Sequence, residues 1–126
     1  MNRFQECVRE FHRKFNQPIG ERPCIDESRT RLRADLIREE ALETMIAIRT
    51  GDLVGVADGI VDLIYVALGA AVEFGIDITP IFEIVHAANM RKIGGPARCD
   101  GKILKPEGWE APDAAILQEL AKQGSR

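Results

Sequence analysis

Apolar residues recur at intervals of three and four along most of the chain, which is the spacing that places them on one face of an α-helix. The segments that carry this spacing are separated by Gly, Pro, Asp and Thr, residues that end or begin helices. No segment has the alternation of apolar and polar residues that is typical of a half-buried strand. Helices are expected over residues 2–15, 29–50, 53–74, 79–93 and 113–123. The sequence therefore predicts an all-α fold, a bundle of four to five helices.

The segments 29–50 and 53–74 are the longest of these and are joined only by Gly51 and Asp52. Glycine readily adopts the left-handed conformation that ends a helix, and aspartate is a good N-cap. Gly75 is expected to end the second of the two helices in the same way. Because the connection is so short, the two helices are predicted to form a central antiparallel hairpin.

The ends of the other helices are also marked in the sequence. Asp26 or Ser28 is expected to cap the first helix of the hairpin. Thr79, followed by a proline in the first turn, is expected to open the next helix, which should end at Gly94. A Pro- and Gly-rich loop and a short helix are expected to make up residues 96–126.

Length and composition fit a single cytoplasmic domain. The chain has 126 residues, of which 45% are hydrophobic and 29% charged, and one domain is expected over residues 1–126. The net charge of −3 lacks the basic excess of nucleic-acid-binding proteins, so no nucleic-acid partner is expected. The first residues lack the apolar stretch of a secretory signal, and the three cysteines have no CxxC spacing. We therefore expect reduced thiols in the cytoplasm.

Residues 53–72 form an apolar run that is long enough to cross a bilayer. Asp58 and Asp62 lie near the middle of this run, and no basic residues flank it, so no membrane partner is expected. A helix that is apolar nearly all round needs cover on every side. A partner subunit could provide that cover.

Two acidic stripes interrupt the apolar faces of the hairpin helices. Glu40 and Glu43 share one stripe of the first helix, with Glu39 at its edge, while Asp58 and Asp62 share one stripe of the second. Glu43 lies eight residues before the glycine of the turn and Asp58 seven after it. Glu40 and Asp62 each lie eleven residues from that glycine. Since both helices have the same rise, these pairs stand at matching heights and four carboxylates are expected to converge.

Carboxylates at close range repel one another unless a cation lies between them. Oxygen ligands without His or Cys suit Mg²⁺ or Mn²⁺ better than Zn²⁺. Arginines could instead neutralise one or two of the acids, although they would not explain the matched heights. The candidates for such pairs are Arg31, Arg33, Arg38 and Arg49.

The motif Glu40-x-x-Glu43 with Glu39 before it, followed by the acidic turn from Asp58 to Asp62, resembles the all-α nucleoside triphosphate pyrophosphohydrolase superfamily. That superfamily includes MazG, dimeric dUTPases and phosphoribosyl-ATP pyrophosphohydrolase. The stretches VHAANMRKIGG and DGKILKPEGWEAPD resemble its MazG-like branch, which is related to phosphoribosyl-ATP pyrophosphohydrolase. The likeness extends over roughly residues 4–113.

One position departs from the superfamily pattern. The second acidic element of the superfamily is usually ExxD, and the residue three before Asp62 is Gly59. Asp58 precedes Asp62 by four residues, which also places it on the same helical face. Asp58 would therefore stand in for the missing acid.

The resemblance implies a MazG-like bundle that hydrolyses a nucleoside triphosphate to the monophosphate and pyrophosphate with Mg²⁺ or Mn²⁺. It implies Glu40, Glu43, Asp58 and Asp62 as metal ligands, with Glu40 also taking part in catalysis. Glu39 would be a further ligand or the general base for the attacking water. Catalysis of this kind consists mostly of positioning and charge neutralisation, which converging acids and a metal can supply.

The resemblance also implies substrate contacts outside the acidic stripes. Tyr65, one turn after Asp62, could contact the ligand or simply pack, and Trp109 could cover a base or anchor the tail. A lysine near the end of a helix could instead serve the helix dipole. The residues expected to contact substrate are Tyr65, Asn89, Lys92, Lys102 and Lys105.

Three functions remain open from the sequence. The first is a nucleoside triphosphate pyrophosphohydrolase that sanitises the nucleotide pool. The second is a phosphoribosyl-ATP pyrophosphohydrolase, and the third is a non-catalytic helical assembly module that holds a structural divalent ion. The oligomers of the superfamily, together with the apolar helix over 53–74, predict a homodimer or homotetramer.

Overall fold

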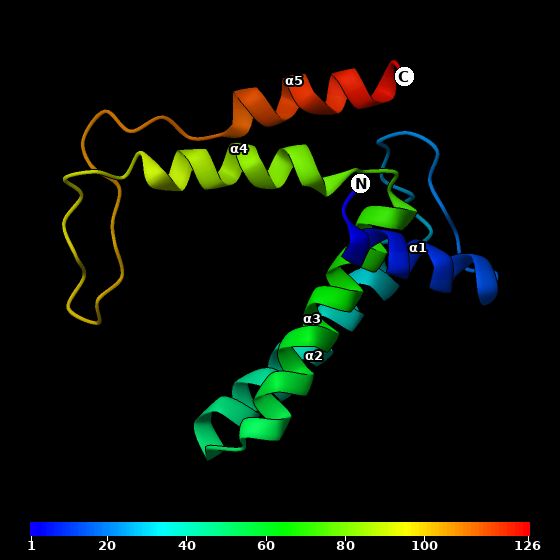
Figure 1. Ribbon diagram of the computed structural model, residues 1–126, viewed down its shortest axis with the longest axis horizontal. Coiled ribbons are helices and arrows are strands. Elements are labelled where there is room, and N and C mark those ends of the chain that lie inside the picture. Colours follow the sequence, from blue (N-terminus) through cyan, green and yellow to red (C-terminus); the bar gives the residue numbers. More distant parts are fainter. The chain divides into compact units, whose positions relative to one another are not determined.

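The computed structural model describes residues 1–126 and contains helices but no strands (Figure 1). A single antiparallel bridge joins Ala97 and Ile103 in the loop before the last helix. The prediction of an all-α fold is confirmed. The five helices are α1 (Arg3–Lys14), α2 (Thr30–Thr50), α3 (Leu53–Glu73), α4 (Ile78–Met90) and α5 (Asp113–Gly124).

The chain forms two compact units. The first covers Met1–Asp77 and holds α1, α2 and α3, while the second covers Ile78–Arg126 and holds α4 and α5. The single domain expected over residues 1–126 stays a prediction.

Helices α2 and α3 form the predicted hairpin, and they pack against each other along their length (Figure 1). Gly51 ends α2 in the left-handed conformation, with φ of 72°. The Asp52 side chain accepts a hydrogen bond from the Gly55 backbone N–H at 3.0 Å and so caps α3. Gly75 follows α3 with φ of 67°, which confirms the expected stop. Helix α1 packs against α3.

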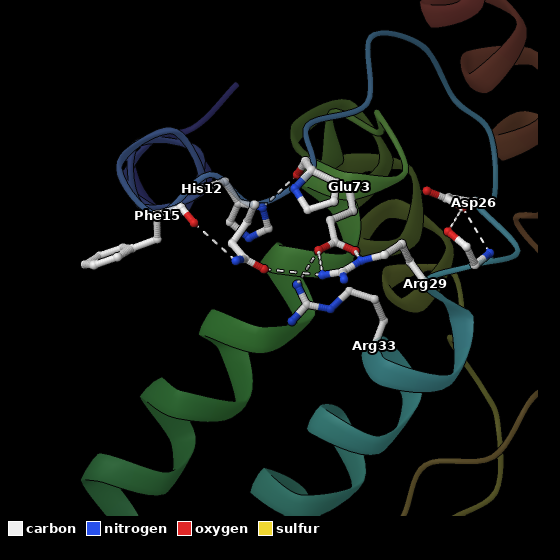
Figure 2. Close-up of polar contacts among 9 residues, drawn as sticks. His12, Phe15, Asp26, Arg29, Arg33 and Glu73 are labelled. Atoms are coloured by element: carbon white, nitrogen blue, oxygen red, sulfur yellow. Dashed lines mark hydrogen bonds and ion pairs between the residues drawn. The ribbon is translucent and has the colours of Figure 1, made fainter.

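A buried ion pair fixes the end of α3 to the start of α2 (Figure 2). The Glu73 side chain is fully buried, and its two carboxylate oxygens accept hydrogen bonds from Arg29 Nη2 at 2.8 Å and Arg29 Nε at 3.2 Å. Arg33 Nη1 lies 3.5 Å from the same carboxylate. Two guanidinium groups compensate the one charge that α3 buries at its end, which is how such a charge is tolerated away from water.

This ion pair explains why the expected cap of α2 was wrong. The N-cap residue is Arg29, whose guanidinium binds Glu73. It makes no side-chain cap hydrogen bond, since a guanidinium has only donors and an N-cap side chain must accept from a backbone N–H. Asp26 instead accepts hydrogen bonds from the backbone N–H and the hydroxyl of Ser28, at 3.0 and 2.6 Å (Figure 2). Asp26 and Ser28 therefore stabilise a turn that precedes the helix.

The loop between α1 and α2 lies against the end of α3. The Gly20 backbone N–H donates to the Val72 carbonyl at 2.9 Å, and the Cys24 N–H donates to the Phe74 carbonyl at 3.0 Å. His12 is buried and its Nδ1 lies 2.8 Å from the Pro18 carbonyl, so this histidine packs against the loop. The loop and the ion pair together hold the hairpin at the end far from its turn.

In the second unit, α4 and α5 pack against each other (Figure 1). Helix α4 begins at Ile78, so Thr79 lies inside its first turn and is not its cap. The helix also ends at Met90, earlier than expected from Gly94. The chain tightens there, because the Lys92 N–H donates to the Asn89 carbonyl three residues back at 3.1 Å.

Helix α3 passes a length and composition test for a membrane span, with a mean hydropathy of 1.8. Only 17% of that stretch is buried within the chain. Val54 is 80% exposed, Val61 59% and Ile64 48%. The helix therefore carries apolar surface that α1 and α2, the other helices of its unit, do not cover.

Candidate active site

The hairpin brings the predicted acids together. Glu43, Asp58 and Asp62 line one groove of about 270 Å³ on the surface of α2 and α3, near the turn. Glu40 lies one turn from Glu43 and is half-buried, as is Asp62, while Glu39, Glu43 and Asp58 are exposed. The acids expected at matching heights therefore face a common region.

Electrostatics place Glu40 at the centre of this cluster. Its pKa is raised above the ordinary value of 4.5, first by burial and then by the charges of Glu43, Asp62, Glu39 and Asp58. The other four acids are thus close enough to Glu40 for their charges to act on it. Each ionised carboxylate makes the ionisation of Glu40 less favourable.

No arginine neutralises the cluster. The side chains of Arg29 and Arg33 are turned to Glu73, and none of the five acids forms an ion pair with Lys or Arg. One carboxylate oxygen of Glu40, Oε2, is buried and has no hydrogen-bond partner. A buried carboxylate oxygen without a donor is costly, and a cation is the ligand that would satisfy it.

The donor set therefore fits Mg²⁺ or Mn²⁺, which prefer carboxylate and water oxygens. In the side-chain conformations of the structure, no three acidic, His or Cys side chains already form a group that could hold a metal ion. Ligation would require the carboxylates on α2 and α3 to turn toward a common point. The predicted roles of Glu39, Glu40, Glu43, Asp58 and Asp62 as ligands or catalytic residues stay predictions.

Tyr65 packs beside this region against α1. Its ring meets the Phe11 ring edge to face, with centroids 5.7 Å apart and an interplanar angle of 89°. Burial raises the pKa of its hydroxyl. The packing interpretation of Tyr65 is what the structure shows, and a contact with substrate stays a prediction.

The predicted substrate residues Asn89, Lys92, Lys102 and Lys105 belong to the second unit. The ammonium groups of Lys92 and Lys105 lie 5.3 and 5.1 Å from the centre of the Trp109 ring. The indole N–H of Trp109 donates to the Ala88 carbonyl at 2.8 Å, which anchors the loop to α4. Neither lysine forms an ion pair with a carboxylate.

Asn89 and Lys102 have different surroundings. Asn89 is exposed at the end of α4 and lines a hollow of about 380 Å³ together with Lys92 and Ile103. Lys102 is exposed on a turn in which Arg98 and Asp100 form an ion pair at 2.6 Å. Their contact with substrate stays a prediction.

Sequence reasoning missed two features of the first unit. One is the Glu73 ion pair, which a charged residue at the end of an apolar helix could have indicated, by the same reasoning that singled out Asp58 and Asp62. The other is a close contact between Thr44 and Gly59, inside the acidic region. A glycine among the acids was noticed only as a departure from a motif.

A protein-family model described as phosphoribosyl-ATP pyrophosphohydrolase matches residues 8–89, which is more than half of the chain. The chain belongs to the phosphoribosyl-ATP pyrophosphohydrolase family. This family is part of the MazG-like all-α nucleoside triphosphate pyrophosphohydrolase superfamily, so the resemblance is confirmed. No match was found among curated proteins.

Membership in the family supports a pyrophosphohydrolase, an enzyme that acts on phosphoric anhydride bonds. The matched residues include the whole α2 and α3 hairpin with all five acids. They end at Asn89, so Lys92, Lys102 and Lys105 lie beyond them.

Proposed function

We propose that this chain is a divalent-metal-dependent pyrophosphohydrolase whose substrate is phosphoribosyl-ATP. The observation that carries the proposal is the half-buried Glu40, which has an unpartnered carboxylate oxygen and stands among four other acids without an arginine. The family description favours phosphoribosyl-ATP over the general nucleoside triphosphate that was the leading expectation from sequence.

Glu40, Glu43, Asp58 and Asp62 would hold Mg²⁺ or Mn²⁺ between α2 and α3. The ion, when bound, neutralises phosphate oxygens and lowers the pKa of an attacking water. Glu39 is exposed at the edge of the cluster, where it can accept the proton of that water. Attack of this water at phosphorus would break one phosphoric anhydride bond and give a nucleoside monophosphate and pyrophosphate as the two products.

The second candidate is a wider range of substrates, the nucleoside triphosphates in general. They carry the same triphosphate as phosphoribosyl-ATP, so the acids of the hairpin serve both equally. The observation that favours them is that Lys92, Lys102 and Lys105 lie outside the residues that match the family model. Lysines bind phosphate as flexible point charges and give no preference for a base or a second ribose.

The proposal is tested by incubating the purified chain with phosphoribosyl-ATP and with a panel of nucleoside triphosphates, in Mg²⁺ or Mn²⁺. We expect pyrophosphate and not orthophosphate, with the highest kcat/KM for phosphoribosyl-ATP. Glu40→Gln, which keeps the shape of the side chain, should lower kcat/KM by about a hundredfold or more.

The outcomes separate the three functions. If pyrophosphate is released from the nucleoside triphosphates but not from phosphoribosyl-ATP, the substrate is a nucleoside triphosphate, the second candidate. Turnover that is equal in the wild type and in Glu40→Gln would show that the activity does not come from the hairpin. If no substrate gives pyrophosphate but the metal still raises the melting temperature, the non-catalytic assembly module with a structural ion would be the remaining function.

A further inference from the structure

Helices α2 and α3 come close together beside the acids at two buried residues, Thr44 and Gly59. A Cβ atom at position 59 would lie 2.6 Å from Thr44 Oγ1, 3.1 Å from its Cα and 3.2 Å from its Cβ. Two of these three atoms cannot move without α2 itself. Only the absence of a side chain at Gly59 lets the helices come this close.

The Thr44 hydroxyl cannot easily turn away from this contact. Its Oγ1 donates a hydrogen bond of 2.6 Å to the Glu40 carbonyl one turn earlier. Rotation would leave a buried hydroxyl without a partner. The contact is therefore held on the α2 side by a hydrogen bond to the residue that carries the unpartnered carboxylate oxygen.

The contact lies in the middle of the acids. Thr44 directly follows Glu43, and Gly59 directly follows Asp58. One helical turn away stand Glu40 on α2 and Asp62 on α3. The distance between the helices at this contact therefore sets the distance between the carboxylates on the two sides.

We propose that Thr44 and Gly59 are positioning residues, whose close contact sets the separation of the acids on α2 and α3 so that one divalent cation can reach both helices. This inference rests on the proposed metal-dependent function. It also accounts for the departure of this chain from the ExxD pattern. Because Thr44 fills the space beside position 59, the additional acid of α3 stands at position 58.

The test compares Mn²⁺ binding by the wild type and Gly59→Ala, measured as loss of the free-ion signal in electron paramagnetic resonance without substrate. Residues that orient ligands typically change metal affinity by about 10- to 100-fold, and we expect a loss of that size. The melting temperature of Gly59→Ala in chelator should be close to that of the wild type. This would show that the lower Mn²⁺ affinity is not caused by unfolding.

Gly69→Ala is the matched control. Gly69 is also buried on α3 and faces α2, and its Cβ would lie 2.5 Å from the Arg33 guanidinium. It stands seven residues beyond Asp62. This variant should disturb the packing of α2 and α3 yet bind Mn²⁺ with the affinity of the wild type.

Thr44→Ala in the Gly59→Ala background is the rescue. It removes the oxygen that the new Cβ would meet at 2.6 Å and leaves contacts that a shift of a few tenths of an ångström relieves. The double variant should recover most of the lost affinity. It also decides the question if Gly59→Ala alone does not fold.

Each result has one meaning. Equal Mn²⁺ affinity in the wild type and Gly59→Ala, or a folded double variant that binds no better than Gly59→Ala, would overturn the positioning role and leave the proposed function standing. An equal loss in Gly69→Ala would also overturn it, because general loosening would then explain the effect. A wild type that binds no Mn²⁺ would overturn the proposed function as well.

Discussion

Glu40 differs from the other acids of the hairpin because one of its carboxylate oxygens is buried without a hydrogen-bond partner. The same residue has the neighbouring charges of Glu43 and Asp62 acting against its ionisation. A carboxylate in such a position lowers the stability of the metal-free protein and gains most from a cation. The stability of the fold should therefore depend on whether Glu40 is protonated and on whether the proposed metal is bound.

The pH dependence of stability should show this link. Burial, followed by the nearby carboxylates, raises the pKa of Glu40 above 4.5. The folded state then holds the proton more tightly than the unfolded chain, so the contribution of Glu40 to stability is full below that value and is lost as the pH rises through the folded-state pKa. In chelator, the melting temperature of Glu40→Gln minus that of the wild type should increase between about pH 4 and pH 7. A difference that does not change with pH would contradict this prediction.

Glu43→Gln and Asp62→Asn should separate catalysis from folding. Each removes one negative charge from the cluster, so each should abolish measurable pyrophosphate release. The fold without metal should be intact or slightly more stable, because repulsion has been relieved. Turnover and thermal melting in chelator measure the two effects. Unfolding of either variant in chelator would show that these acids are structural.

At the scale of the elements, the Glu73 ion pair holds the ends of α2 and α3 together. Glu73→Gln should destabilise the protein by about 3–5 kcal/mol, because it leaves the partly buried Arg29 and the buried Arg33 without their counter-charge. Asp100→Asn is the control, since the Arg98–Asp100 pair is exposed to solvent and should contribute far less to stability. Urea denaturation at one fixed protein concentration gives both values. Equal effects would contradict the structural role of Glu73.

The sequence was informative about the turn of the hairpin and the end of α3, where the cause is local. Gly51, Asp52 and Gly75 mark helix ends through their own backbone preferences, and all three behave as predicted. The N-cap of α2 could not be predicted in this way. Arg29 occupies it because its guanidinium reaches Glu73, a residue 44 positions away.

The candidate site was predictable to a similar extent. Helical periodicity and equal rise were enough to place Glu40, Glu43, Asp58 and Asp62 in one region, because both depend only on counting from the turn. The contact of Thr44 with Gly59 depends on how closely the two helices approach. That distance results from the packing of side chains between the two helices. It cannot be predicted from the spacing of residues along the sequence.

In the molecule as a whole, α3 exposes apolar surface that the other helices of the first unit, α1 and α2, do not cover. We propose a homodimer or homotetramer in which another copy covers this surface, because Val61 and Ile64 are 59% and 48% exposed in the single chain. Sedimentation velocity should show a dimer or tetramer, and Ile64→Lys should shift it toward monomer. A wild type that stays monomeric at all concentrations, or that floats with lipid vesicles, would contradict this proposal.

The most direct measurement of the central claim is the anomalous diffraction of crystals grown with Mn²⁺. In the proposed site, carboxylates from two helices hold one catalytic divalent cation. We predict an anomalous peak between α2 and α3, with carboxylate oxygens of Glu40, Glu43 and Asp62 as its ligands. A peak that contacts only one helix, or acids of the hairpin without any bound ion while Mn²⁺ supports turnover, would contradict the account.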